Sequence, residues 1–130
     1  MPKVIDYENK PSIIDLRENR KKIGTAEMLI SEGDGASGAR LQRITLIGKD
    51  MVHVHKLEQA WVCERGRGKI FVDGQVHEFY PGTRVIIPAG IPHAIQVAES
   101  FSEVVYLCVS CLPMTRRNIK NRETASGNDW

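Results

Sequence analysis

The stretch GKDMVHVHKLEQAWVCERG at residues 48–66 decides the fold, together with GTRVIIPAGIPHAIQV at residues 82–97. In the first stretch, His53 and His55 are separated by one residue within a run that has the pattern of a β-strand. Side chains two residues apart on a strand share one face about 7 Å apart, so both imidazoles can reach one metal ion at about 2.1 Å. Gln59 is the next polar side chain on that face. The pattern therefore predicts a strand that carries part of a metal site.

Short alternating runs separated by turn signals continue on both sides of this segment. The expected strands are residues 25–30, 40–47, 52–55, 60–64, 69–72, 76–79, 83–87, 94–97 and 103–109. Asp73-Gly74 lies between two such runs and predicts a tight hairpin, because both central positions of a type I′ turn need a positive φ. So many short strands must bury one shared apolar face. The sequence therefore predicts an all-β single domain closed into a barrel or jelly roll.

The two ends of the chain are expected to lie outside this barrel, which would span residues 25–112. Residues 1–24 form an N-terminal arm in this interpretation, and residues 10–24 suggest a helix bounded by a proline and a glycine. Residues 113–130 carry four basic side chains and two acidic ones, a composition that favours a solvated, disordered tail. The alternative is a tail that packs on a partner subunit.

Charge and composition exclude several classes of protein. The chain has 130 residues and a net charge of +2, which is too small and too scattered for a nucleic-acid partner. No apolar run approaches the roughly 20 residues that cross a bilayer, and the charged start MPKVIDYENK does not resemble a signal peptide. We therefore expect no membrane partner and a cytoplasmic protein. The chain has three cysteines, an odd number that favours reduced thiols over disulfides. Cys108 and Cys111 form a CxxC, but their side chains would point to opposite faces of a strand, which favours structural roles.

These residues resemble the cupin superfamily, whose two motifs run G-x5-H-x-H-x3,4-E-x6-G and G-x5-P-x-G-x2-H-x3-N. The matching positions are Gly48, His53, His55, Gln59, Gly66, Gly82, Pro88, Gly90 and His93. The resemblance covers residues 48–97 and implies a single-domain cupin barrel, also called a double-stranded β-helix, that pairs as a homodimer. It also implies one divalent transition metal as cofactor. The ligands implied are His53, His55, Gln59 and His93.

Gln59 occupies the position at which the motif has a metal-binding glutamate. Glu58 is the competing candidate, since a bulge beside the site would turn it inward. We favour Gln59, and three imidazoles with one amide leave the charge of a divalent ion uncompensated. Such a site should attract a small anionic ligand, and it suits Lewis-acid chemistry better than oxygenase chemistry, which commonly uses a carboxylate ligand. The set accepts Mn, Fe, Co, Ni, Cu or Zn.

Three further residues are candidates for substrate binding. Arg43 and Thr45 share one face of a predicted strand. If that face points into the barrel, Arg43 can hold a substrate carboxylate in a bidentate pair. The alternative is that Arg43 lies outside the barrel. Trp61 follows Gln59 on the metal face and would line the pocket floor or pack in the core. No general base is identified.

The function predicted from these features is that of a metal-dependent enzyme. It would isomerise, tautomerise or eliminate from a small anionic carbonyl compound or a hydroxy acid that resembles a sugar acid. A dioxygenase is the alternative among enzymes. A non-catalytic cupin that binds or senses a small ligand is the alternative outside them, because fold does not decide function.

Overall fold

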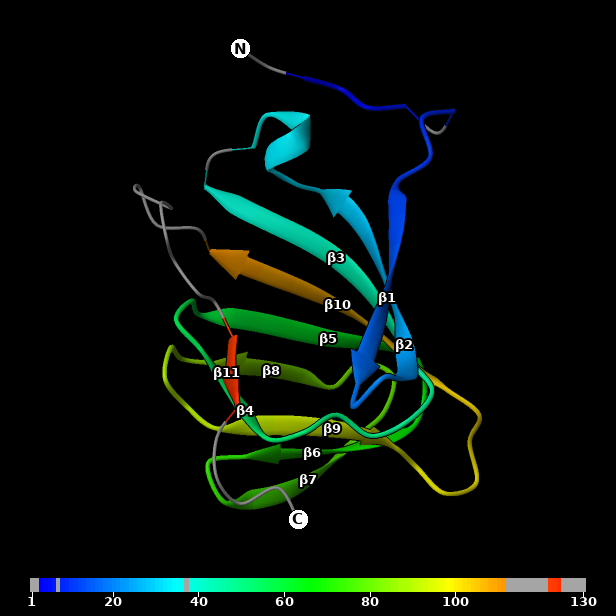
Figure 1. Ribbon diagram of the computed structural model, residues 1–130, viewed down its shortest axis with the longest axis vertical. Coiled ribbons are helices and arrows are strands. Elements are labelled where there is room, and N and C mark those ends of the chain that lie inside the picture. Colours follow the sequence, from blue (N-terminus) through cyan, green and yellow to red (C-terminus); the bar gives the residue numbers. More distant parts are fainter. Residues whose placement is uncertain (1–2, 7, 37, 112–121, 125–130) are drawn as a thin grey trace.

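The computed structural model describes residues 3–6, 8–36, 38–111 and 122–124. They form two antiparallel sheets and one short 3₁₀ helix, η1 (Glu32–Asp34), which confirms the predicted all-β class (Figure 1). The six-stranded sheet has the order β1 (Ser12–Glu18), β2 (Lys21–Ile30), β3 (Ala39–Leu46), β10 (Val104–Cys111), β5 (Gln59–Gly66), β8 (Arg84–Ile87). The five-stranded sheet has the order β11 (Arg122–Thr124), β4 (His53–His55), β9 (His93–Val97), β6 (Gly68–Val72), β7 (Gln75–Phe79). No helix in these described segments is long and apolar enough to span a bilayer.

The core lies between the two sheets and contains an aromatic cluster. The Trp61 and Tyr106 ring centroids are 4.8 Å apart, and Phe79 lies 5.6 Å from Tyr106. Ile95 and Leu46 complete the centre with almost no exposed surface. Each comes from a strand on which alternate side chains point inward, so residues from both sheets fill one apolar interior.

The helix expected over residues 10–24 is wrong, because these residues form the hairpin of β1 and β2. Asn19 and Arg20 have φ values of 51° and 68°, so they form the two left-handed positions of its turn. Gly24 does not end a helix: a Cβ at this position would lie 2.2 Å from the Thr45 carbonyl oxygen, so glycine lets β2 approach β3 closely. The chain thus enters the six-stranded sheet at Ser12, well before the expected start of the barrel.

The other hairpin prediction is confirmed. Asp73 and Gly74 have φ values of 49° and 85° and join β6 to β7, where Val72 is paired with Gln75. Within the C-terminal segment, β11 pairs antiparallel with β4. The rest of the predicted tail, residues 113–121 and 125–130, lies outside the described residues.

Candidate metal centre

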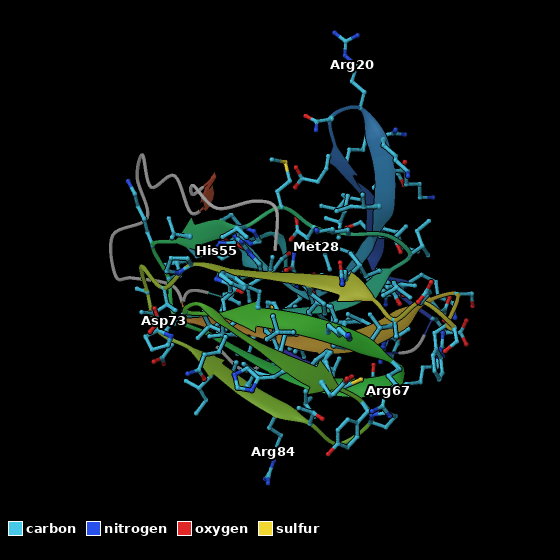
Figure 2. All side chains as sticks on the ribbon, turned by 90° about the horizontal axis from the view of Figure 1, so that it is seen from below. Arg20, Met28, His55, Arg67, Asp73 and Arg84 are labelled. Carbon is cyan, nitrogen blue, oxygen red and sulfur yellow. The ribbon has the colours of Figure 1, made fainter. Side chains whose placement is uncertain are left out.

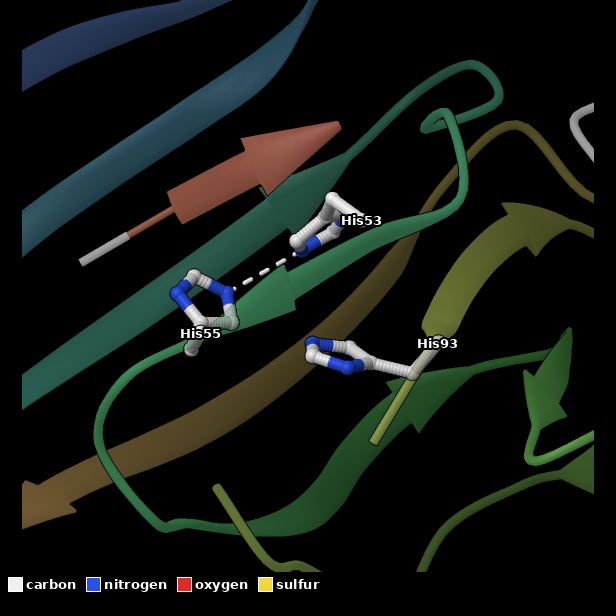
Figure 3. Close-up of side chains that lie close together, drawn as sticks. All are labelled: His53, His55 and His93. Atoms are coloured by element: carbon white, nitrogen blue, oxygen red, sulfur yellow. Dashed lines mark hydrogen bonds between the residues drawn. The ribbon is translucent and has the colours of Figure 1, made fainter. Parts of the chain in front are cut away.

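Three histidines from two neighbouring strands meet in one place (Figure 3). β4 carries His53 and His55, and its pairing with β9 sets His53 opposite His93. One nitrogen from each ring can be chosen so that all three lie within 4.8 Å of one another. The Nε2 atoms of His53 and His55 are 3.0 Å apart, and the centroids of His53 and His93 are separated by 4.4 Å. The arrangement can form a metal site, and it unites three of the four ligands expected from the sequence.

Backbone carbonyls orient two of these rings. The Met51 carbonyl oxygen lies 2.6 Å from Nδ1 of His53, and the Ile91 carbonyl oxygen lies 2.8 Å from Nδ1 of His93. A carbonyl can only accept, so each Nδ1 carries the proton and each Nε2 presents its lone pair. Metal-binding histidines are commonly held in this way, so the residues present fit a divalent ion.

Asp50 supports His53 from behind and was missed in the sequence. Its carboxylate lies 3.6 Å from the His53 Nδ1 and accepts the backbone N–H of Met51 at 2.9 Å. A carboxylate behind a ligating imidazole raises the basicity of the ring and strengthens metal binding. In the sequence, the only indication that Asp50 belongs to the site was its position three residues before His53.

Gln59 is buried at the start of β5, whereas Glu58 is exposed to solvent. The Gln59 Oε1 accepts the indole N–H of Trp61 at 3.0 Å, and its Nε2 donates to the hydroxyl of Ser110 at 3.4 Å. Both hydrogen bonds hold the amide in place, and an amide oxygen with two lone pairs can accept from Trp61 and still bind a cation. The burial therefore favours Gln59 over Glu58, and ligation by Gln59 stays a prediction.

A cavity of about 150 Å³ adjoins the histidines. Its apolar wall consists of Leu16, Ile23, Ile44, Leu46, Trp61 and Tyr106. Its other lining residues are Arg17, Glu18, Gln42, Asp50, His53, His55, Gln59 and Cys108. A small hydrophobic chamber with a few convergent polar groups is the usual form of a small-molecule site.

The sequence left two orientations open for Arg43 and Thr45, and the structure has the outward one. On β3 the alternate residues Gln42, Ile44 and Leu46 line the cavity, so Arg43 and Thr45 belong to the other face. There Arg43 Nε donates to Glu64 at 2.8 Å, and the guanidinium lies 3.6 Å from Glu27. The hydrogen bond to Glu64 raises the pKa of Arg43. Its charge is therefore engaged by surface carboxylates and does not face a ligand in the barrel.

Two cysteines are buried free thiols, as the sequence favoured. Cys108 lines the cavity, and desolvation raises its pKa to about 11. Desolvation also raises the pKa of Cys63. Both groups are therefore neutral thiols at physiological pH and serve as small apolar side chains.

Residues 46–110 match the Cupin domain family, and the chain belongs to this family. Its structure is similar to that of the polyketide cyclase RemF from Streptomyces resistomycificus, with a TM-score of 0.74, 23% identity, and coverage of 97% of this chain and 89% of that one. It is also similar to Rru_A2000 from Rhodospirillum rubrum, a cupin-2 domain, with a TM-score of 0.72, 17% identity, and coverage of 98% and 82%.

A third similar structure is that of HppE with Fe(II), with a TM-score of 0.67, 10% identity, and coverage of 82% of this chain and 59% of that one. At these identities the three likenesses show the shared fold. No curated protein matches the chain.

Proposed function

We propose that this cupin is a metal-dependent enzyme that acts on a small anionic carbonyl compound or hydroxy acid. The reaction is an isomerisation, a tautomerisation or an elimination. The observation that carries the proposal is the convergence of His53, His55 and His93 beside a cavity that also contains the amide of Gln59. These four residues would hold one divalent transition metal. When bound, the ion supplies Lewis acidity, which polarises a carbonyl and makes the adjacent C–H bond more acidic.

The charges of the cavity suit a substrate that gains negative charge on oxygen. The four proposed ligands are neutral, so the full charge of the ion acts on an oxygen that approaches it. Glu18 and Asp50 line the same cavity and supply two negative charges from outside the ligand set. Arg17, which also lines the cavity, donates to Asp15, and the field of a bound ion at the substrate oxygen would favour an anion.

The size of the cavity limits the reacting part of the substrate. A volume of about 150 Å³ is smaller than the roughly 300–1,000 Å³ of drug-sized sites. It accommodates a short keto acid or one unit of a longer chain. The apolar walls from β3 and β10 would contact the carbon skeleton.

The similarity to a polyketide cyclase supports carbonyl chemistry in this fold. RemF is described as a cyclase of polyketides, a class of compound rich in carbonyl groups. The small volume here, about 150 Å³, favours a substrate of a few carbons over a fused ring system.

The test begins with metal analysis of protein purified without a chelating column. Wild-type protein should contain about one divalent ion per chain, and His53→Ala should lose it, whereas His77→Ala, which removes an exposed histidine on β7, should retain it. The loaded protein is then incubated with unsaturated uronates, keto acids and diketones, and the products are followed by NMR. Oxygen consumption would indicate the dioxygenase instead. Metal binding without turnover of any compound would favour a binding or sensing role.

We also propose that two copies pair through β1. This strand is the edge of the six-stranded sheet and exposes Ile13 and Ile14 to 63% and 49%. An exposed apolar edge strand is a ready surface for pairing with another strand. Sedimentation velocity should show a dimer for wild type and a monomer for Ile13→Asp. Val76→Asp, at a 55% exposed position on β7, is the matched control and should remain dimeric.

A further inference from the structure

The hairpin of β1 and β2 forms one wall of the cavity. Its pairing shifts between Leu16, opposite Gly24, and Arg17, opposite Lys22, so Ile23 is an extra residue on β2. Such a bulge bends the strand and redirects its side chains. Leu16 and Ile23 both line the cavity, while the tip of the hairpin, with Arg20, projects away from the barrel (Figure 2). The base of the hairpin therefore belongs to the site.

Glu18, the last residue of β1, lies on the cavity side of this hairpin. Leu16 and Glu18 are half-buried, whereas the intervening Arg17 and the preceding Asp15 are exposed. Arg17 also lines the cavity, and its guanidinium donates to Asp15 at 3.2 Å and to the Arg20 carbonyl oxygen at 3.3 Å. Glu18 lines the same cavity as His53 and His55.

We propose that Glu18 is the general base of the reaction, an inference that rests on the proposed function. The carboxylate removes the proton from the carbon next to the substrate carbonyl. The C–H bond breaks, an O–H bond forms on Glu18, and the electron pair moves onto the carbonyl oxygen to give an enolate. The same proton returns to the neighbouring carbon or oxygen, so the isomerisation consumes no other reagent.

The other acidic and basic groups of the cavity have different tasks, and the Arg17 guanidinium is engaged by Asp15 and the Arg20 carbonyl oxygen. Asp50 accepts the Met51 N–H and lies behind His53, on the side away from the converging Nε2 atoms. Cys108 is a neutral thiol because burial raises its pKa to about 11. Tyr106 packs within the aromatic cluster against Trp61. Glu18 is the carboxylate that enters the cavity from the hairpin.

The charge balance favours this assignment. Proton transfer would move one negative charge from the carboxylate to the substrate oxygen, where a bound divalent ion would stabilise it. The total charge of the site is unchanged, so the step requires little rearrangement of solvent. The half-buried position of Glu18 also lets the proton equilibrate with water between turnovers.

The experiment uses full-length protein charged with Zn²⁺ and follows exchange of the pyruvate methyl protons in D₂O by NMR. Glu18→Gln should slow exchange by at least about 100-fold, the range for loss of a general base. Zinc content should be unchanged, and Glu18→Asp should restore part of the rate. Asp15→Asn, on the exposed face of the same strand, is the matched control and should exchange at the wild-type rate.

Binding of oxalate, a dianion that resembles the enolate of pyruvate, provides a readout without turnover. Glu18→Gln should bind oxalate at least about fivefold more tightly by calorimetry, because a negative charge that faces the ligand is removed. Equal oxalate affinities, or wild-type exchange in Glu18→Gln, would overturn the role of Glu18 and leave the proposed function intact. Absence of exchange in zinc-loaded wild type would instead overturn the proposed function for keto acids, and the base role with it.

Discussion

Replacing Gln59 with glutamate tests the unusual member of the proposed ligand set. Gln59 is 6% exposed, accepts the Trp61 N–H and donates to Ser110. Without metal, the variant buries a carboxylate that keeps the bond from Trp61 and gains one from the Ser110 hydroxyl. The remaining desolvation should lower the unfolding free energy by about 1–3 kcal/mol. For a chain of this size, the melting temperature should fall by about 3–12 °C.

Metal should offset part of this loss, because the carboxylate cancels one unit of the charge of the ion. We expect zinc affinity to rise at least about tenfold, which adds about 1.4 kcal/mol of stability at saturating zinc. The assay is thermal unfolding in EDTA and in excess Zn²⁺, for wild type and variant. The zinc-induced rise in melting temperature should be about 3–5 °C larger in Gln59→Glu.

Gln42→Glu is the matched control for this experiment. Gln42 lines the same cavity, but its amide donates to the Met28 sulfur at 3.1 Å and is outside the proposed ligand set. The control adds the same charge to the same cavity, so its zinc-induced rise should stay close to that of wild type. If the rise in Gln59→Glu does not exceed that in Gln42→Glu, then Gln59 is not a ligand and the reasoning from a neutral set fails.

Three further predictions follow from the same geometry. His53→Ala and His93→Ala each remove one of the converging imidazoles and should weaken zinc binding at least about 100-fold. Competition with a chelator measures the affinity, and retained affinity would show that the ion binds elsewhere. Burial raises the pKa of Cys108 from its ordinary value to about 11, so folding favours the neutral thiol. The unfolding free energy should therefore fall as pH rises from about 9 toward 11, by up to about 2–3 kcal/mol. Urea unfolding at pH 8 and 10.5 measures this loss, and Cys108→Ala should show a correspondingly smaller pH dependence. Arg20→Gly should raise the unfolding free energy by about 0.5–1 kcal/mol, because Arg20 has a φ of 68°; a destabilised variant would contradict strain at this turn.

Much of the fold was predictable because its signals are local. Turn chemistry at Asp73-Gly74 and the alternation of residues 40–47 depend on near neighbours in the chain, and both appear as strands and turn in the structure. The spacing of His53 and His55 placed two rings on one face for the same reason. The resemblance to the cupin motifs added His93, which no local pattern joins to the pair.

Only the tertiary structure decided which strand faces point inward and which segments pair. Residues 10–24 have no strong local preference, and they become strands because β2 pairs with β3 and buries Ile23 against the core. Arg43 lies outside because alternation leaves the choice between two faces open, and packing across the barrel resolves it. Glu18 and Asp50 join the histidines only after the hairpin and the loop before β4 are placed. The chain alone thus determined most of the strands after residue 24 and the metal-binding residue types, whereas the N-terminal hairpin and the composition of the cavity required contacts between residues distant in sequence.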